Sequence, residues 1–170
     1  NVVVAHKGQV RWRALTSGIA VHSAQPERGV NAIYRMSRVI QSIERWANDV
    51  APTLGKDPLC GQTTLSVGTV AGGIGVNVVP DQCAIDIDVR VLPGDDPEAV
   101  RRHVMDHVDA DPDVPFDVEH DAPFLVGLPL AAHGNDDLAE QLVNAVRHET
   151  GQGETIAVPF GTDAAQLAAD

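Results

Sequence analysis

The sequence predicts an α+β fold: a four-stranded antiparallel sheet with two helices on one face, followed by a shorter segment of different character. Extended or alternating apolar patterns occur at residues 10–22, 64–71 and 83–91, as in half-buried strands. Helical spacing follows the first pattern at 29–50 and the third from about residue 95. With a short strand at 114–118, the order is strand, helix, strand, strand, helix, strand. That order closes into the ferredoxin-like arrangement.

The first half of this unit is a strand that leads into a helix. After a short strand-like run at 1–5, residues 10–22 form one long extended segment. Apolar residues then recur with helical spacing from Ile33 to Val50, and Ala51-Pro52 ends the helix because proline cannot continue it. Residues 53–63 are rich in turn signals and are expected to form a loop.

The second half repeats the strand and helix pattern. The strand at 64–71 is broken by the glycine-rich residues 72–75. Residues 83–91 alternate strictly, which indicates a strand with one buried face. Pro97 and Glu98 suit the first turn of a helix, and an aspartate just before them can cap it. The buried stripe of this helix is expected at Val100, Val104 and Val108.

After Asp121 the pattern changes, and we expect two parts, residues 6–120 and residues 121–170. The second part is expected to hold a connecting segment at 122–129, a helix at 136–150, a strand at 155–159 and a further helix at 164–169. Gly151 is a typical C-terminal stop for the 136–150 helix. Its inward residues are predicted to be Leu138, Leu142, Ala145 and Val146.

Composition limits the classes of function. The chain has 12 basic and 24 acidic residues, a net charge of −12, which argues against a nucleic-acid groove or an anionic membrane surface as partner. No apolar run is long enough for a transmembrane helix, and no signal peptide is evident. The simplest expectation is a cytoplasmic protein with Cys60 and Cys83 reduced. Because the chain starts without methionine and ends in an apparent helix, we expect a piece of a longer protein.

The most informative motif lies between the first strand and the first helix. His22-Ser23 is followed by a Pro/Gly turn and by Gly29-x-Asn31-Ala32, which holds an imidazole at the end of a strand, where it can face a ligand. Further motifs follow at 72–81 (GGIGVNVVPD), 86–94 (DIDVRVLPG) and 159–164 (PFGTDA). In this order they resemble the M20 metallopeptidase family. Residues 6–120 resemble its lid (dimerisation) domain and 121–170 a fragment of its catalytic domain.

The resemblance implies the chemistry of the whole protein. M20 enzymes use two divalent metals, zinc or cobalt, to hydrolyse N-acyl amino acids or small peptide-like amides. An acetylornithine deacetylase or succinyl-diaminopimelate desuccinylase is the first expectation, with glutamate carboxypeptidase and aminoacylase types open. The family's metal ligands are not identifiable in this sequence. We therefore expect no metal site in this chain, no activity from it alone, and a homodimer formed through the lid.

The resemblance also assigns residues. His22 matches the lid histidine that reaches into the partner subunit's active site and donates a hydrogen bond to the oxyanion. Asn77 and Arg90 match substrate-binding positions, and Gly161 and Thr162 match a loop that contacts substrate. The residues alone leave other interpretations: His22 as a turn histidine that caps the next helix, Asn77 as a turn asparagine, and Arg90 as a surface partner of Asp88.

Other functions remain open at this stage. The chain could be a purely structural homodimerisation module in which His22 has no catalytic role. A free-standing ferredoxin-like domain that senses a ligand or binds RNA is a third possibility. The acidic charge and the lack of exposed aromatic residues on the strands weigh against RNA. His103 and His107 are four residues apart, as in some zinc sites, but the pair is expected to be incidental and exposed. Asp163 is expected to anchor a loop rather than to bind metal.

Overall fold

The computed structural model describes residues 1–167 and contains nine strands and four α-helices in that range. The strands are β1 (Val2–His6), β2 (Gly8–Ser17), β3 (Val21–His22), β4 (Thr64–Gly72), β5 (Val78–Val79), β6 (Gln82–Val91), β7 (Glu119–His120), β8 (Leu125–Gly127) and β9 (Thr155–Val158). The helices are α1 (Ala32–Arg45), α2 (Pro97–Asp109), α3 (Asp136–Thr150) and α4 (Ala164–Leu167). Among these residues, none of the helices is both long and apolar enough to cross a membrane.

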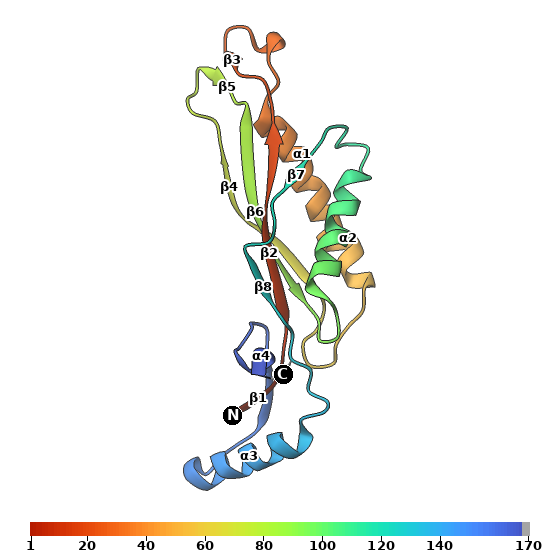
Figure 1. Ribbon diagram of the computed structural model, residues 1–170, viewed down its shortest axis with the longest axis vertical. Coiled ribbons are helices and arrows are strands. Elements are labelled where there is room, and N and C mark those ends of the chain that lie inside the picture. The colour runs from red at the N-terminus through yellow and green to blue at the C-terminus, as the bar shows by residue number, and fades with distance from the viewer. Residues whose placement is uncertain (168–170) are drawn as a thin grey trace.

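The main sheet has the order β4-β6-β2, and β7 and β8 both pair with the far edge of β2. All of these pairings are antiparallel. The predicted α+β fold with a four-stranded antiparallel sheet is confirmed, and its fourth position is shared by two short strands. In the long β2–β6 pairing Gln9 lies opposite Arg90 and Ser17 opposite Gln82, so the strands run the length of the domain (Figure 1).

Two predicted strands differ from the structure. The extended segment at 10–22 is divided, because β2 ends at Ser17 and β3 begins at Val21 and pairs with β5 in a separate two-stranded ribbon. Residues 114–118 are not a strand. The Val114 N–H donates to the Asp111 carbonyl in a turn, and Pro115 has no N–H for a ladder. Val114 instead packs into the core, and the strand that pairs with β2 begins at Glu119.

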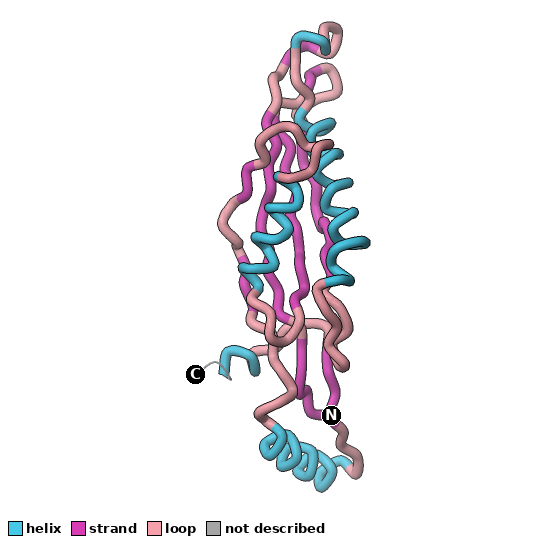
Figure 2. The backbone as a smooth tube through the Cα atoms, turned by 90° about the vertical axis from the view of Figure 1, so that its right-hand side faces the viewer, coloured by secondary structure: helices cyan, strands magenta, loops and turns pink. Residues whose placement is uncertain are grey.

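The core lies between the sheet and the two helices α1 and α2, which run side by side along one face of the sheet (Figure 2). Alternate residues of β2 and β6 point into it, as the sequence pattern predicts. Helix α2 contributes the predicted Val100, Val104 and Val108. The buried residues of the core are mainly aliphatic, with the two tryptophans Trp12 and Trp46 as its largest members.

Side-chain caps define where both helices begin. The Asn31 side chain accepts hydrogen bonds from the N–H groups of Ile33 and Tyr34, and Asp96 does the same for Glu98 and Ala99. Each cap satisfies donors that the first turn of a helix leaves without partners. The predicted helix start at Asp96 and Pro97 is confirmed.

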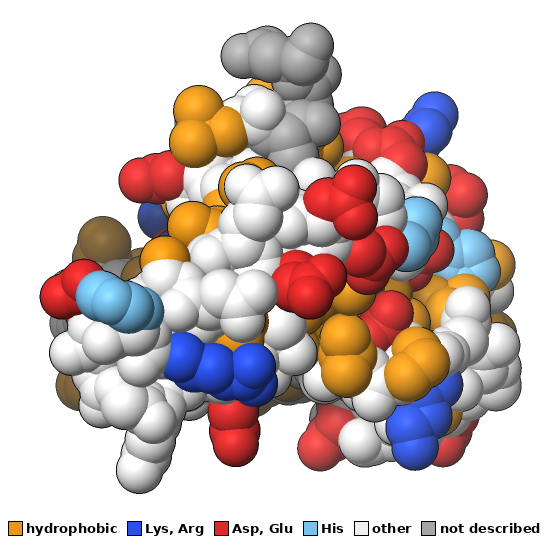
Figure 3. All heavy atoms as spheres, turned by 90° about the horizontal axis from the view of Figure 1, so that it is seen from below, with side chains coloured by type: hydrophobic (Ala, Val, Ile, Leu, Met, Phe, Trp, Pro, Cys, Tyr) orange, Lys and Arg blue, Asp and Glu red, His pale blue; other side chains and the backbone are white. Residues whose placement is uncertain are grey.

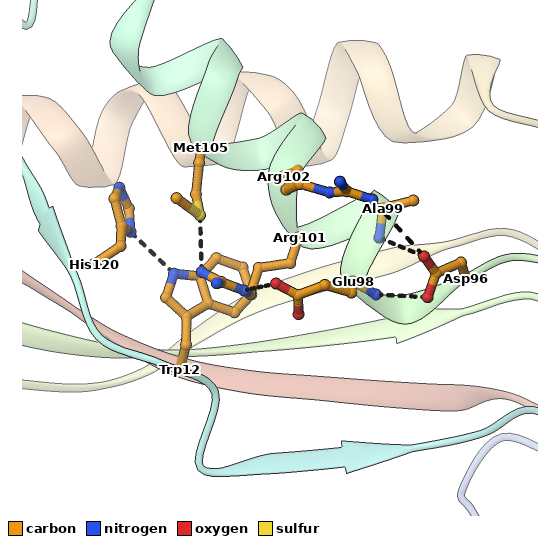
Figure 4. Close-up of polar contacts among 8 residues, drawn as sticks. All are labelled: Trp12, Asp96, Glu98, Ala99, Arg101, Arg102, Met105 and His120. Carbon is orange, nitrogen blue, oxygen red and sulfur yellow. Dashed lines mark hydrogen bonds and ion pairs between the residues drawn. The ribbon is translucent and has the colours of Figure 1, made fainter.

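Each tryptophan indole is held by a histidine. Trp12 Nε1 donates to His120 Nδ1 at 3.0 Å, and Trp46 Nε1 donates to His103 Nδ1 at 3.1 Å. Figure 4 shows the surroundings of Trp12, where Arg101 bonds to Glu98 at 2.9 Å and its guanidinium lies 5.9 Å from the indole ring centre. His103 is exposed as predicted, but it is not incidental, because it satisfies a buried indole.

The end of the molecule that carries both termini has a different build. β1 and β9 form a parallel pair, and α3 packs against β1. The predicted inward stripe of α3 is only partly confirmed. Leu138 and Leu142 line the groove beside β1 but stay exposed, Ala145 is also exposed, and Val143 is the buried residue of the helix. Much of the apolar surface of α3 is therefore open to solvent. The predicted helix beyond Leu167 lies outside the described residues.

The exposed apolar residues of this end line an open groove. Val3, Leu138, Leu142 and Leu167 are among the side chains around its volume of about 260 Å³. Seen from this end, apolar side chains lie open to solvent among acidic and basic ones (Figure 3).

Candidate functional site

The sequence-predicted site residues fall into two groups at opposite ends of the main sheet. We call the group around His22 and Asn77 the tip, and the group around Arg90, Gly161 and Thr162 the base. The tip lies beyond Ser17 and Gln82, whereas Arg90 is eight residues further along β6. At about 3.3 Å per residue, Gln82 and Arg90 are roughly 26 Å apart. Figure 1 shows the β3–β5 ribbon at one end of the molecule and α4 near the other.

At the tip, β3 and β5 hold the histidine turn in place. His22 lies opposite Val78, and the Ser23 N–H donates to the Asn77 carbonyl at 2.9 Å. Gly29 is packed so closely that a Cβ there would lie 2.5 Å from a methyl carbon of Val21. A side chain at this position would therefore push the following segment away from β3.

The hydrogen bonds of His22 define which nitrogen can act on a ligand. The Ala24 N–H donates to His22 Nδ1 at 3.1 Å, so Nδ1 is an acceptor. A neutral imidazole must then carry its proton on Nε2. His22 is exposed, and no residue among 1–167 bonds to its Nε2. His22 thus also stabilises its own turn, as the alternative interpretation expects. The Nε2–H group on the other side of the ring remains as a donor that points away from the turn.

Asn77 lies beside this histidine in the β4–β5 loop. Its side chain is exposed, and its Oδ1 is 3.3 Å from where a Cβ on Gly75 would be. The Val78 N–H donates to the Gly75 carbonyl at 3.2 Å, which closes the turn. The structure therefore brings His22 and Asn77 to the same end of the ribbon.

At the base, Arg90 is on the open polar face of the sheet. Its guanidinium bonds to Asp88 at 3.0 Å, and Asp88 also receives a 3.0 Å bond from Arg11. The surface pairing with Asp88 expected as an alternative is therefore present. Arg90 is still placed one strand away from the loop of Gly161 and Thr162, because its cross-strand neighbour Gln9 lies against that loop.

Gly161 and Thr162 line a cleft of about 450 Å³ together with Lys7, Gln9 and the segment 124–128. A Cβ on Gly161 would be 3.6 Å from Gln9 Nε2, and one on Gly127 would be 3.1 Å from Gln9 Cγ. Both glycines thus leave room for the glutamine side chain. The cleft walls are mostly polar, which suits a polar ligand.

Sequence reasoning missed Lys7 and Gln9 as cleft residues. Lys7 is 6% exposed, its Nζ donates to the Gln62 carbonyl, and burial lowers its pKa, with the nearby Arg90 acting in the same direction. Lys7 stands within the His6-Lys7-Gly8 segment where the resemblance begins, but nothing in the sequence shows that it lines a cleft with residues 161–166. Only the pairing of distant segments reveals that shared cleft.

The remaining candidates offer no reactive centre. Burial raises the pKa of both Cys60 and Cys83, and neither forms a disulfide. Within residues 1–167, no three His, Cys, Asp or Glu side chains lie together in a way that could hold a metal ion.

Comparison with known proteins agrees with the fold and the motifs. A family model described as the peptidase dimerisation domain matches residues 4–113. A protein of Aspergillus flavus named "probable carboxypeptidase" is 35% identical over 118 residues, which are 66% of this chain and 27% of that protein. A protein of Paracoccidioides lutzii with the same name is 32% identical over 111 residues, 62% of this chain and 25% of that protein. The chain thus spans about a quarter of these relatives.

Solved structures share the fold over nearly the whole chain. The aminopeptidase PepT of Bacillus cereus superposes with a TM-score of 0.69 at 23% identity, over 99% of this chain and 42% of that one. A tripeptidase of Staphylococcus aureus gives a TM-score of 0.70 at 21% identity, over 98% and 42%. The family model of the dimerisation domain matches residues 4–113, which is well over half of this chain. The chain therefore belongs to the M20 peptidase family.

Proposed function

We propose that this chain is the lid, residues 6–120, and an adjoining part of the catalytic domain, residues 121–170, of a metal-dependent amide hydrolase that acts as a homodimer. The substrate is an N-acyl amino acid or a small peptide, and the two divalent metals, zinc or cobalt, bind to residues outside this chain. Deacetylase or desuccinylase activity is the first candidate. The carboxypeptidase names of the relatives favour cleavage of a C-terminal peptide bond as the second candidate activity.

The observation that carries the proposal is the separation of two half-sites. The tip presents an exposed N–H donor at His22, and the base presents a polar cleft with Gly161 and Thr162 on its wall. Neither half can serve the other within one chain, because they lie at opposite ends of the sheet. A two-fold dimer that places the tip of one subunit over the base of its partner would complete both sites at once.

The free edge of the sheet supports such pairing. β4 pairs only with β6 among the described strands, so its other edge is open to another strand. Exposed apolar side chains lie beside that edge: Val70 on β4, Ile74 and Val76 in the loop after it, and Tyr34 on α1. We infer that this surface forms the interface, because a monomer rarely leaves such residues together in water.

In this arrangement His22 Nε2–H would donate to the oxygen of the scissile carbonyl as negative charge develops on it. A single donor of this kind typically accounts for roughly 100- to 1000-fold in rate. The bond from the Ala24 N–H to Nδ1 keeps the imidazole in the tautomer that this role needs. Arg90 and Asn77 would bind the carboxylate or carbonyl groups of the substrate.

The experiment measures hydrolysis by the full-length protein, with and without zinc or cobalt. The substrates are N-acetyl-ornithine, N-succinyl-diaminopimelate, an N-acyl glutamate and a dipeptide, which tests cleavage of a C-terminal peptide bond. His22→Asn is the informative variant, since its Oδ1 can still accept the Ala24 N–H while the Nε2–H donor is gone. We expect an intact dimer with turnover reduced roughly 100- to 1000-fold. Unchanged turnover would favour the alternative of a purely structural dimerisation module, which is supported by the hydrogen bond that ties His22 Nδ1 to the turn.

A further inference from the structure

His6 is a fully buried histidine at the junction of the two parts of the chain. It is 0% exposed, at the end of β1, and both of its ring nitrogens have partners. Nδ1 lies 3.0 Å from the Lys7 carbonyl oxygen, and Nε2 lies 3.3 Å from the Thr162 backbone nitrogen. A carbonyl can only accept and a backbone N–H can only donate. His6 is therefore a neutral imidazole with its proton on Nδ1 and an acceptor at Nε2.

The backbone of His6 leaves the ring little freedom to move. Its N–H donates to the Leu130 carbonyl at 3.1 Å, and its own carbonyl accepts from the Leu130 N–H at 3.0 Å. On its other side His6 pairs with Val158 in the parallel β1–β9 ladder. Two segments from distant parts of the sequence thus hold the backbone of His6, and the buried ring is a fixed point in the domain.

The loop between β9 and α4 is held by the His6 ring. β9 ends at Val158, and α4 begins at Ala164. Within residues 1–167, the bond from the Thr162 N–H to His6 Nε2 is the only hydrogen bond on residues 160–162. The Thr162 hydroxyl is buried at its oxygen and has no partner among these residues, although Thr162 lines the cleft at the base. Thr162 thus borders the cleft with a hydroxyl that no described residue uses.

We propose that His6 is a positioning residue: through Nε2 it fixes the backbone of Thr162 and so holds the Gly161–Thr162 loop in the shape that receives substrate. The inference rests on the proposed function, because it takes this loop as a substrate contact. His6 itself does not touch the substrate. An apolar residue of the same size would fill the same space but would leave the Thr162 N–H without an acceptor, and the loop without its tether.

Two substitutions in the full-length protein separate the two nitrogens of the ring. His6→Gln places an amide oxygen near the position of Nε2 and can still accept the Thr162 N–H. His6→Asn places its amide near Nδ1, so it keeps the contact with the Lys7 carbonyl and loses the tether. Both variants are polar and close in size to histidine. Hydrogen exchange of the peptide that covers residues 160–163 reports the tether, and KM against kcat reports its consequence.

We expect His6→Asn to speed exchange of this segment and to raise KM about fivefold with little change in kcat, the effect of losing one ordinary hydrogen bond. His6→Gln should restore both values to near those of the unmodified protein. Unchanged exchange in His6→Asn, or equal damage in both variants, would overturn the proposal. Faster exchange with an unchanged KM would overturn the substrate role of the tether.

A second variant covers the case in which His6→Asn does not fold. Thr162→Pro removes the N–H itself and leaves the buried histidine intact, and the preceding Gly161 tolerates the restriction that proline imposes. The same rise in KM is expected, and an unchanged KM would contradict the proposal. Thr162→Val is the control, because it removes the hydroxyl and keeps the N–H, and it should raise KM less than Thr162→Pro does. Failure of the proposed function is distinguishable, because the unmodified protein would then hydrolyse none of the amides while the exchange comparison still reports on the tether.

Discussion

The cap of α1 gives a quantitative test of how the tip is attached to the domain. Asn31 Oδ1 accepts two backbone hydrogen bonds, from Ile33 at 2.9 Å and from Tyr34 at 3.1 Å. Both bonds are exposed, so water can replace them in part. Asn31→Ala should therefore lower the free energy of unfolding by about 1 kcal/mol, within the usual range of about 0.5–2 kcal/mol for loss of a cap.

The assay is urea denaturation of the full-length protein, with Asn31→Asp as the matched control. Aspartate keeps the acceptor oxygen and adds negative charge at the positive end of the helix, so its stability should equal or exceed that of the unmodified protein. Asp96 caps α2 independently, with bonds of 3.1 and 3.2 Å, and Asp96→Ala should cost a similar amount. Equal destabilisation by Asn31→Ala and Asn31→Asp would refute the capping argument.

Three further predictions follow from individual contacts. Burial lowers the pKa of His120, with Arg101 acting in the same direction, so the unfolded chain binds the proton more readily. The free energy of unfolding should therefore keep its full value above pH about 6.5 and fall as the pH drops below it. Urea denaturation at several pH values should show a smaller fall for His120→Asn. Gly18→Ala should lower the unfolding free energy by about 1–3 kcal/mol, because a Cβ there would meet the Val30 carbonyl oxygen at 2.1 Å. Gly68→Ala is the control, with 3.9 Å to its nearest atom; equal effects on the melting temperature would contradict the steric argument. Chelation of divalent metal should abolish turnover of the full-length protein while gel filtration still shows a dimer; turnover that survives chelation would contradict the proposed chemistry.

The sequence pattern predicts the main sheet well because the strands are half-buried. Residues 83–91 alternate without exception, and the structure places every second one in the core. The helix starts are equally local, since Asn31 and Asp96 cap the turns that directly follow them. Such features depend on neighbours within a few residues and are visible in the sequence.

The errors occur where distant segments decide the outcome. The pattern at 10–22 is continuous, but Gly18 lies so close to Val30 and Pro80 that the chain leaves the sheet there. The predicted inward residues of α3 stay exposed because spacing identifies an apolar stripe but not whether a neighbour covers it. The contact of His6 with Thr162, 156 residues apart, has no local signal at all.

In the candidate site, too, the identity of the residues can be predicted from the sequence but their arrangement in space cannot. The resemblance predicts His22, Asn77, Arg90, Gly161 and Thr162 as a set, but it does not show that they lie in two groups at opposite ends of the sheet. That separation comes from the register of β2 with β6, which places Gln82 beside Ser17 and Arg90 beside Gln9. The resemblance already implies that His22 serves a partner subunit, and the separation of tip and base supports that expectation independently.

The most direct test of this expectation is subunit mixing in the full-length protein. His22→Asn damages only the tip, and Arg90→Ala damages only the base. If each active site combines the tip of one subunit with the base of its partner, a mixed dimer of the two inactive variants holds one intact site of two. Random exchange at equal concentrations should then restore about a quarter of the unmodified activity. No recovery, with exchange of subunits verified by differential labelling, would contradict the account, because it would mean that tip and base act within one chain or not at all.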